Sequence, residues 1–97
     1  MSARNWKALA RVLGVESGSE SAVQAKASRL TALFHEHLMR ETDAGESADY
    51  STRELARAGS CEDTAARELL HEMSVDDPDR LERLDADRWR FHAPEEE

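Results

Sequence analysis

The chain is poor in several residue types, and each shortage narrows the class of protein. Its one cysteine, Cys61, cannot form an internal disulfide, which agrees with a reducing compartment. No hydrophobic run approaches the roughly 18 residues of a membrane span, and the N-terminus lacks the cleavage pattern of a signal peptide. The 97 residues suffice for one modest core. We therefore expect one cytoplasmic domain spanning residues 1–97, with no membrane partner.

Recognisable catalytic and metal-binding patterns are also missing. The sequence has no phosphate-binding loop, and no Ser or Cys nucleophile has a base at a known spacing. Cys61 stands where a small core residue is expected. His35 and His37 lie two residues apart on a predicted helix, point about 200° from each other and cannot chelate one ion. His71 and His92 are isolated, with no second cysteine to complete a zinc site. We predict a protein that is not an enzyme and that binds no metal or cofactor.

Residues 50–73 have the outline of two short helices joined by a tight turn. Ser51 can cap the first helix, and Glu54 stands three residues later, where it completes a capping box. Tyr50 and Leu55 occupy the two positions of a hydrophobic staple. The start of the first helix is therefore well marked, and the segment is expected to form a helix-turn-helix.

The turn between the two helices contains one glycine. Gly59 is expected to adopt the left-handed conformation that ends the first helix. Ser60 and Asp63 are spaced as a weaker cap for the second helix. The apolar residues of the unit fall where two crossed helices touch, and they are Leu55, Ala56, Cys61, Ala66, Leu69, Leu70 and Met73.

Residues 80–92 follow as two short runs around Asp85-Ala86-Asp87. In the second run apolar and polar residues alternate, with Trp89 and Phe91 on one face and Arg88, Arg90 and His92 on the other. A period of two predicts a strand, and the two runs together predict a β-hairpin. An acidic linker is expected before the helix-turn-helix, over residues 42–49, and a solvated tail after the hairpin, over residues 94–97.

A hairpin directly after a helix-turn-helix resembles the winged helix-turn-helix family, most of whose members are DNA-binding transcription regulators. The resemblance covers about half of the chain and is carried by Glu54-Leu55-Ala56, Gly59-Ser60-Cys61, Ala66, Leu69 and Trp89-Arg90-Phe91. In the family a glycine commonly falls four residues after the first-helix alanine, whereas here Ser60 stands there and Gly59 precedes it. The resemblance implies a mainly α fold with a small β-hairpin wing and binding to double-stranded DNA. The pattern specifies a fold better than a function.

Residues 5–41 form an N-terminal extension of two predicted helices. The first runs from about Asn5 to Leu13, ends at Gly14 and has one apolar stripe of Trp6, Leu9, Ala10 and Leu13. The second runs from about Glu20 to Arg40 and has a stripe of Val23, Ala27, Leu30, Phe34 and Leu38. It would extend about 30 Å, more than the motif can cover. The uncovered surface predicts a homodimer paired through the N-terminal helices, as in many winged-helix regulators. In the alternative, the first helix folds back over this surface within one chain.

The charge balance conflicts with DNA binding. The chain has 21 acidic and 13 basic residues and a net charge of −8, so that DNA should repel it. Two lysines against eleven arginines, together with the many acids, resemble proteins of halophilic cells. In such cells molar salt screens charge repulsion beyond about 3 Å. Two alternatives stay open: the surface binds no nucleic acid at all, or a genome rich in G and C favours arginine over lysine.

Eight residues are the candidates for DNA contact. The second motif helix should read the major groove, and arginines of the first motif helix and of the wing should anchor phosphates. The groove-reading candidates are Thr64, Arg67 and His71, and the phosphate anchors are Arg53, Arg57, Arg83, Arg88 and Arg90. The alternative for the arginines is an ordinary solvated surface with ion pairs, such as Arg83 with Asp85 or Asp87.

The exposed positions of the second motif helix carry one basic residue against four acidic ones, which is a poor DNA face. The alternative function is a protein-interaction module with the same fold, in which Glu62, Glu68 and Glu72 meet a basic partner. The two functions predict different surfaces. Arginines that converge on one face favour DNA, whereas arginines interleaved with acids favour a protein partner.

Overall fold

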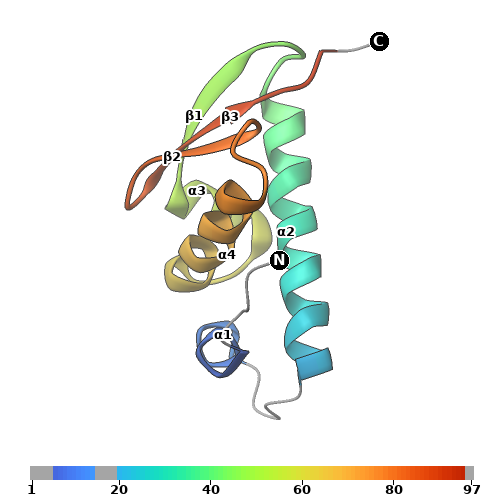
Figure 1. Cartoon of the computed structure of the whole chain (residues 1–97), viewed down its shortest axis with the longest axis vertical. Coiled ribbons are helices and arrows are strands. Elements are labelled where there is room, and N and C mark those ends of the chain that lie inside the picture. The colour runs from blue at the N-terminus through green and yellow to red at the C-terminus, as the bar shows by residue number, and fades with distance from the viewer. Residues whose placement is uncertain (1–5, 15–19, 96–97) are drawn as a thin grey trace.

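A computed structural model describes residues 6–14 and 20–95 of the chain. The helices are α1 (Trp6–Leu13), α2 (Glu20–Glu41), α3 (Thr52–Gly59) and α4 (Asp63–Asp76), and the strands are β1 (Ser47–Ser51), β2 (Leu81–Asp85) and β3 (Arg88–His92). Figure 1 shows α2 as a long rod, with the sheet beside one end, α1 beside the other, and α3 and α4 between them. The described chain is mainly helical with one small sheet, which confirms the predicted fold class at that level.

The three strands form one antiparallel sheet in the order β1-β3-β2. β2 and β3 pair as the predicted hairpin, and Trp89 and Phe91 are buried in the core as predicted. β1 pairs with the other edge of β3, with Ser47 opposite His92 and Tyr50 opposite Trp89. The central strand of the sheet is therefore the last one in the chain.

The prediction of a linker over residues 42–49 is wrong for residues 47–49. Residues 47–49 belong to β1, and Thr42 is buried, with its hydroxyl hydrogen-bonded to that of Tyr50. β1 has the sequence SADYS, in which one large apolar residue gives no visible alternation. Its strand conformation depends on pairing with β3. At one end of this pairing Ser47 lies opposite His92, which is 45 residues later in the chain.

α2 supplies the longest wall of the core. All five residues of its predicted apolar stripe are buried, and they are Val23, Ala27, Leu30, Phe34 and Leu38. Both α3 and α4 pack against α2, and together they bury Leu55, Ala56, Ala66, Leu69 and Leu70 as predicted. Cys61 and Met73 are half-buried against the same cluster. One continuous core therefore joins the helices to the sheet.

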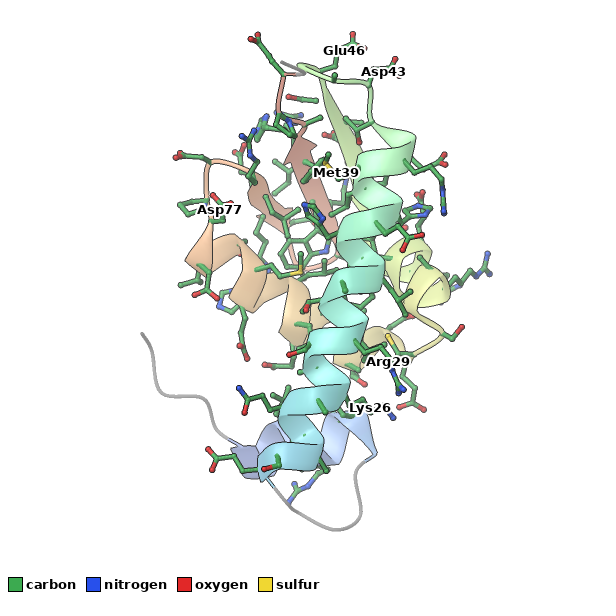
Figure 2. The ribbon with its side chains drawn as sticks, turned by 90° about the vertical axis from the view of Figure 1, so that its right-hand side faces the viewer. Lys26, Arg29, Met39, Asp43, Glu46 and Asp77 are labelled. Carbon is green, nitrogen blue, oxygen red and sulfur yellow. The ribbon has the colours of Figure 1, made fainter. Side chains whose placement is uncertain are left out.

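α1 folds back and contacts both α2 and α4, so that the chain covers its own apolar surface. Leu9 and Leu13 are each 4% exposed, and Val23 on α2 is fully buried. Lys26, seen on α2 beside α1 in Figure 2, donates from Nζ to the carbonyl oxygen of Leu13 at 2.7 Å. The surface that motivated the homodimer prediction is thus not free, and that premise is wrong. The side chain of Trp6 lies outside the described residues.

α3 begins at the predicted cap. The Oγ of Ser51 accepts the backbone N–H of Glu54 at 3.1 Å, and Ser51 has the extended conformation of an N-cap. The carboxylate of Glu54 does not complete the capping box but lies 2.9 Å from Nε2 of His37 on α2. The side chain that was expected to close the first turn therefore ties α3 to the long helix.

The turn after α3 differs from the prediction at both of its key residues. Gly59 is helical, and Ser60 adopts the left-handed conformation, with φ of 54° and ψ of 48°. The N–H of Cys61 bonds to the carbonyl of Ala56 at 2.9 Å, which completes a Schellman motif around Ser60. A Cβ on Gly59 would lie 2.7 Å from Cε1 of Phe34, so glycine is required there for close packing rather than for its φ angle.

The predicted cap of the second helix is also wrong. α4 begins after Glu62, whose side chain makes no capping hydrogen bond, and Ser60 is used by the preceding helix end. The N–H of Ala66 bonds to the Glu62 carbonyl at 3.0 Å as the first helical contact. The start of α4 is therefore fixed by the turn geometry and the core rather than by a side-chain cap.

Replacing Ser60 by glycine should stabilise the protein. The left-handed conformation costs a residue with a Cβ about 1–2 kcal/mol. Glycine avoids this cost but also makes the unfolded chain more flexible, which offsets part of the gain. We expect a net increase in the free energy of unfolding of about 0.5–1 kcal/mol. Gly59→Ala is the matched comparison and should lose about 1–3 kcal/mol through overpacking against Phe34. Urea unfolding followed by circular dichroism measures both. A Ser60→Gly protein no more stable than wild type would contradict the assignment of strain to Ser60.

Candidate nucleic-acid interface

α4 presents to solvent the face that the sequence assigned to base contacts. Its buried side carries Ala65, Ala66, Leu69 and Leu70. On the other side Glu62, Thr64, Glu68 and His71 are exposed, and Asp63, Arg67 and Glu72 are half-buried. The acid-rich character expected of this face is confirmed.

Arg67 is bonded to the hairpin rather than turned to solvent. Its Nε and Nη2 both donate to Oδ1 of Asp87, at 3.0 and 2.8 Å, across 20 residues of sequence. Asp87 lies in the turn between β2 and β3, and its backbone carbonyl accepts the N–H of Thr52 at 3.0 Å. The hydrogen bond from Arg67 holds the pKa of the Asp87 carboxyl below its usual value. Asp87 therefore ties the hairpin turn to α4 and to the start of α3.

A second contact joins the hairpin to α4. The guanidinium of Arg83 lies 5.2 Å from the centre of the Trp89 ring, and its Nη1 is 3.1 Å from Nδ1 of His71. The predicted alternative of an ion pair between Arg83 and the carboxylate of Asp85 or Asp87 is wrong within the described residues. Arg83 instead donates from Nε to the backbone carbonyl of Asp85 at 3.2 Å. Its charge is not neutralised by a bonded carboxylate.

Arg88 and Arg90 lie on the other face of the hairpin, away from the buried Trp89. Arg90 pairs with both carboxylate oxygens of Asp49 on β1, at 2.7 and 3.3 Å, and Arg88 lies 3.7 Å from the same carboxylate. Arg90 is the main cause of the lowered pKa of Asp49. On the opposite side of β3, Glu82 is 3.3 Å from His92. This outer face of the sheet alternates in charge and is not a basic patch.

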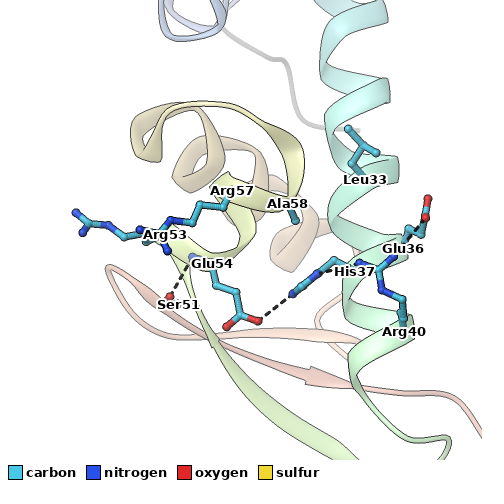
Figure 3. A pocket seen from close by; sticks show the side chains of 9 residues that line it. All are labelled: Leu33, Glu36, His37, Arg40, Ser51, Arg53, Glu54, Arg57 and Ala58. Carbon is cyan, nitrogen blue, oxygen red and sulfur yellow. Dashed lines mark hydrogen bonds and ion pairs between the residues drawn. The ribbon is translucent and has the colours of Figure 1, made fainter.

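Arg53 and Arg57 project from α3 beside a groove that separates α3 from α2. The groove has a volume of about 680 Å³ and is lined by Leu33, Glu36, His37, Arg40, Ser51, Arg53, Glu54, Arg57 and Ala58. Figure 3 shows Arg53 and Arg57 extending from α3 and Arg40 lying across the groove on α2. Arg53 and Arg57 line the groove from its α3 side and Arg40 lines it from its α2 side. No local sequence signal points to Arg40, because its place beside α3 depends on how the two helices cross.

The ionic contacts of these groove arginines are weak. Arg53 lies 3.7 Å from Asp63 and its side chain is 71% exposed, while Arg40 lies 3.7 Å from Glu36. The side chain of Arg57 is exposed and makes no hydrogen bond or ion pair within the part of the chain that the structure describes. Exposed pairs of this kind contribute roughly 0–1 kcal/mol, so they exchange readily for another anion.

The eight predicted DNA-contact residues do not form one patch. Arg53 and Arg57 lie at the groove between α2 and α3, whereas Arg67, His71 and Arg83 meet where α4 joins the hairpin. Arg88 and Arg90 lie on the outer face of the sheet, and Thr64 is exposed on α4. Acids interleave the arginines on all three surfaces. Four of these arginines have a carboxylate within 4 Å, namely Arg53, Arg67, Arg88 and Arg90, whereas Arg57 and Arg83 have none among the described residues.

Cys61 is half-buried at the edge of the core, in the turn after α3. Burial raises the pKa of its thiol, which keeps the sulfur protonated and a poor nucleophile. The position fits the small packing residue that the sequence predicted.

Comparison of the chain with protein-family models, with curated proteins and with solved structures found no match. Over residues 6–14 and 20–95, no helix has both the length and the apolar character that crossing a membrane requires. The same residues contain no group of three or more His, Cys, Asp or Glu side chains placed to hold a metal ion. Any argument for function therefore rests on topology and surface chemistry.

The two lowered carboxyl pKa values predict how stability responds to acid. Because folding lowers the pKa of Asp49 and Asp87, their ion pairs add stability above the ordinary carboxyl range near pH 4. That contribution disappears as the pH falls through the lowered values. Melting temperatures measured from pH 5 to pH 2 should therefore drop more steeply for wild type than for an Asp49→Asn, Asp87→Asn variant.

The matched control for this pH series is Asp43→Asn, Asp79→Asn. It removes the same number of charges from side chains that make no hydrogen bond or ion pair within the described residues. This variant should keep the steep acid loss of wild type. Equal slopes for all three proteins would show that the two ion pairs do not contribute to acid stability.

Proposed function

We propose that this protein is a winged-helix DNA-binding protein of the cytoplasm and that it acts in transcriptional control. The element order from α2 to β3, with β1 added to the hairpin, resembles the winged helix-turn-helix family. The observation that carries the proposal is the fixed position of the hairpin turn, which Asp87 holds against both motif helices. The second motif helix and the wing are thereby held in a fixed relative position. Such a position is needed if the helix is to enter the major groove while the wing contacts the flanking backbone.

The arginines divide into two roles under this proposal. Arg57 and Arg83 have no carboxylate within 4 Å among the described residues and would contact phosphates, and Arg53 would join them by leaving its 3.7 Å contact to Asp63. Arg67 and Arg90 make close hydrogen bonds to carboxylates, and so they would position the helix and the sheet rather than meet DNA. Thr64 and His71 are the candidates for base contact. Pairing of two copies is not part of the proposal, because α1 covers the surface on which that prediction rested.

Salt is the condition that makes the proposal compatible with a net charge of −8. At an ionic strength of about 1 M the Debye length is about 3 Å, so the acids of α4 no longer repel the duplex at a distance. Contacts made at hydrogen-bond distance survive this screening better than long-range repulsion does. We propose that the protein works in a cell of high internal salt.

DNA binding can be measured by fluorescence anisotropy with a random-sequence duplex, in KCl from about 0.1 M to about 2 M. Arg57→Ala should weaken binding to all sequences and reduce the slope of log affinity against log salt by about 0.9, the loss of one phosphate contact. The control is Arg29→Ala, which removes an exposed arginine of α2, outside the two motif helices and the wing. An equal loss of DNA affinity in the two variants would show that Arg57 does not contact the DNA.

A protein-interaction module is the second candidate function, and the acidic α4 face favours it. Glu62, Glu68 and the neighbouring acids would meet a basic surface of a partner, and the interleaved ion pairs are what such a module is expected to show. Absence of DNA binding by wild type at every salt at which the protein is folded would favour this candidate. Binding at any of those salts would favour the DNA-binding protein.

Folding itself should depend on salt if the acidic surface is an adaptation to high ionic strength. The surplus of carboxylates repels itself in dilute buffer, so the melting temperature should rise between about 0.1 M and about 2 M KCl. For a domain of this size each 1 kcal/mol of relieved repulsion corresponds to about 5 °C. Differential scanning calorimetry gives the value, and a melting temperature that stays flat would count against the high-salt proposal.

A further inference from the structure

A second groove lies between α2, the C-terminal end of α4 and the base of the hairpin. It has a volume of about 320 Å³. Its apolar lining consists of Met39, Met73, Leu81, Phe91 and Pro94, and its polar lining consists of His35, Asp76, Asp77 and Arg80. A mainly apolar concavity with a few polar groups is the usual form of a small-ligand site.

The apolar wall has a rigid floor and adaptable sides. Leu81 and Phe91 are each 2% exposed and belong to the core, and the ring of His35 meets Phe91 edge-on at 6.2 Å. Met39 is 41% exposed and Met73 is half-buried, so both thioethers border the opening. Methionine side chains rearrange easily around a bound group. The groove can therefore adapt to an apolar body through rearrangement of its methionine side chains.

The charge around the opening is negative. α4 ends in Asp76 and is capped by Asp77, and its last turn contains no basic residue. Carboxylates are unfavourable at a helix C-terminus, where the dipole already places negative charge. The side chains of Asp76 and Asp77 make no hydrogen bond or ion pair within the described residues. Figure 2 shows Met39 on the side of α2 that faces the sheet, and Asp77 where α4 leads into the hairpin.

Arg80 is the one cation of the described lining, and it is turned toward the sheet. Its Nη1 donates to the carbonyl oxygen of His92 at 3.3 Å, and the backbone N–H of His92 bonds to the Arg80 carbonyl at 2.8 Å. Two unpaired carboxylates and a helix C-terminus therefore face the groove together with one guanidinium that is already engaged. The negative charge around the groove therefore favours a ligand that carries a positive group.

We infer that this groove binds a small organic cation with an apolar body, such as an arylalkylamine. The body would lie against Met39, Met73 and Phe91, and the ammonium would face Asp76 and Asp77. The inferred site shares no residue with the proposed DNA contacts. Since the groove touches both α4 and the base of the hairpin, an occupant would contact the two elements that the proposed interface uses.

Three probes with the same ring and different charge test the site on the full chain. They are 2-phenylethylamine, 2-phenylethanol and phenylacetate, titrated while the methyl signals of ¹³C-labelled methionine are followed by NMR. The amine should give saturable shifts of the Met39 and Met73 signals and bind about three- to fivefold more tightly than the alcohol, with phenylacetate weakest. Equal affinities for the three probes, or no saturable shift with the amine, would overturn the inference.

The variant that isolates the charge is Asp76→Asn, Asp77→Asn. It should abolish the preference for the amine and leave the affinity for the alcohol unchanged. Because it removes carboxylates from a helix C-terminus, it is expected to fold at least as well as wild type. The control, Glu62→Gln, Glu68→Gln, removes the same charge from the N-cap and the exposed face of the same helix and should keep the preference. A preference lost equally in both variants would assign it to net charge rather than to the groove.

A segment of a basic partner protein is the other occupant that the lining could accept. The peptide acetyl-Lys-Phe-Lys-amide serves as its probe in the same NMR titration. Shifts of Met39 and Met73 that arise with the peptide but not with 2-phenylethylamine would overturn the small-ligand assignment. No DNA is present in these measurements, so their failure would leave the proposed DNA-binding function untouched.

Discussion

The hydrogen bond between Trp89 and Thr52 is the contact on which the rest of the fold depends. Trp89 is fully buried on the central strand, and its indole Nε1 donates to Oγ1 of the buried Thr52 at 2.9 Å across 37 residues of sequence. Thr52 begins α3, so this bond fixes the start of the helix-turn-helix to the sheet. An indole N–H left without an acceptor in the core would cost about 1–3 kcal/mol. The cap at Ser51, the strand β1 that precedes it and the Arg83 guanidinium over the Trp89 ring are all arranged around this contact.

Elements marked by local signals could be predicted from the sequence, and elements fixed by distant contacts could not. The cap at Ser51, the stripe of α2 and the alternation of β3 each arise from residues close together in the chain. β1 was missed because only its pairing with β3 makes it a strand. Residue type predicts the left-handed position at Gly59, but the crowding of α3 against Phe34 requires the glycine there and leaves Ser60 in the left-handed conformation.

The candidate interface shows the same division. The acidic face of α4 follows from helical periodicity and was predictable. The partners of the arginines were not, because Arg67 meets Asp87 and Arg90 meets Asp49 only when the hairpin folds onto α4 and β1. Sequence proximity favoured an ion pair of Arg83 with a neighbouring aspartate, whereas the ring of Trp89 and the imidazole of His71 attract its guanidinium in the fold. The charges counted on the predicted helices and strands therefore indicate how acidic the surface is, but they do not indicate which acid pairs with which arginine.

The order of the sheet has a consequence for association between copies. β1 and β2 are both edge strands, and an edge strand offers unpaired backbone groups to any other edge. Charged side chains such as Glu82 and Asp49 discourage such pairing in dilute buffer, but concentrated salt screens them. Each edge is only five residues long, and the register of β2 is interrupted between Arg83 and Asp85. At high salt the shortness and irregularity of these edges, more than their charge, would keep copies of the chain from joining into a continuous sheet.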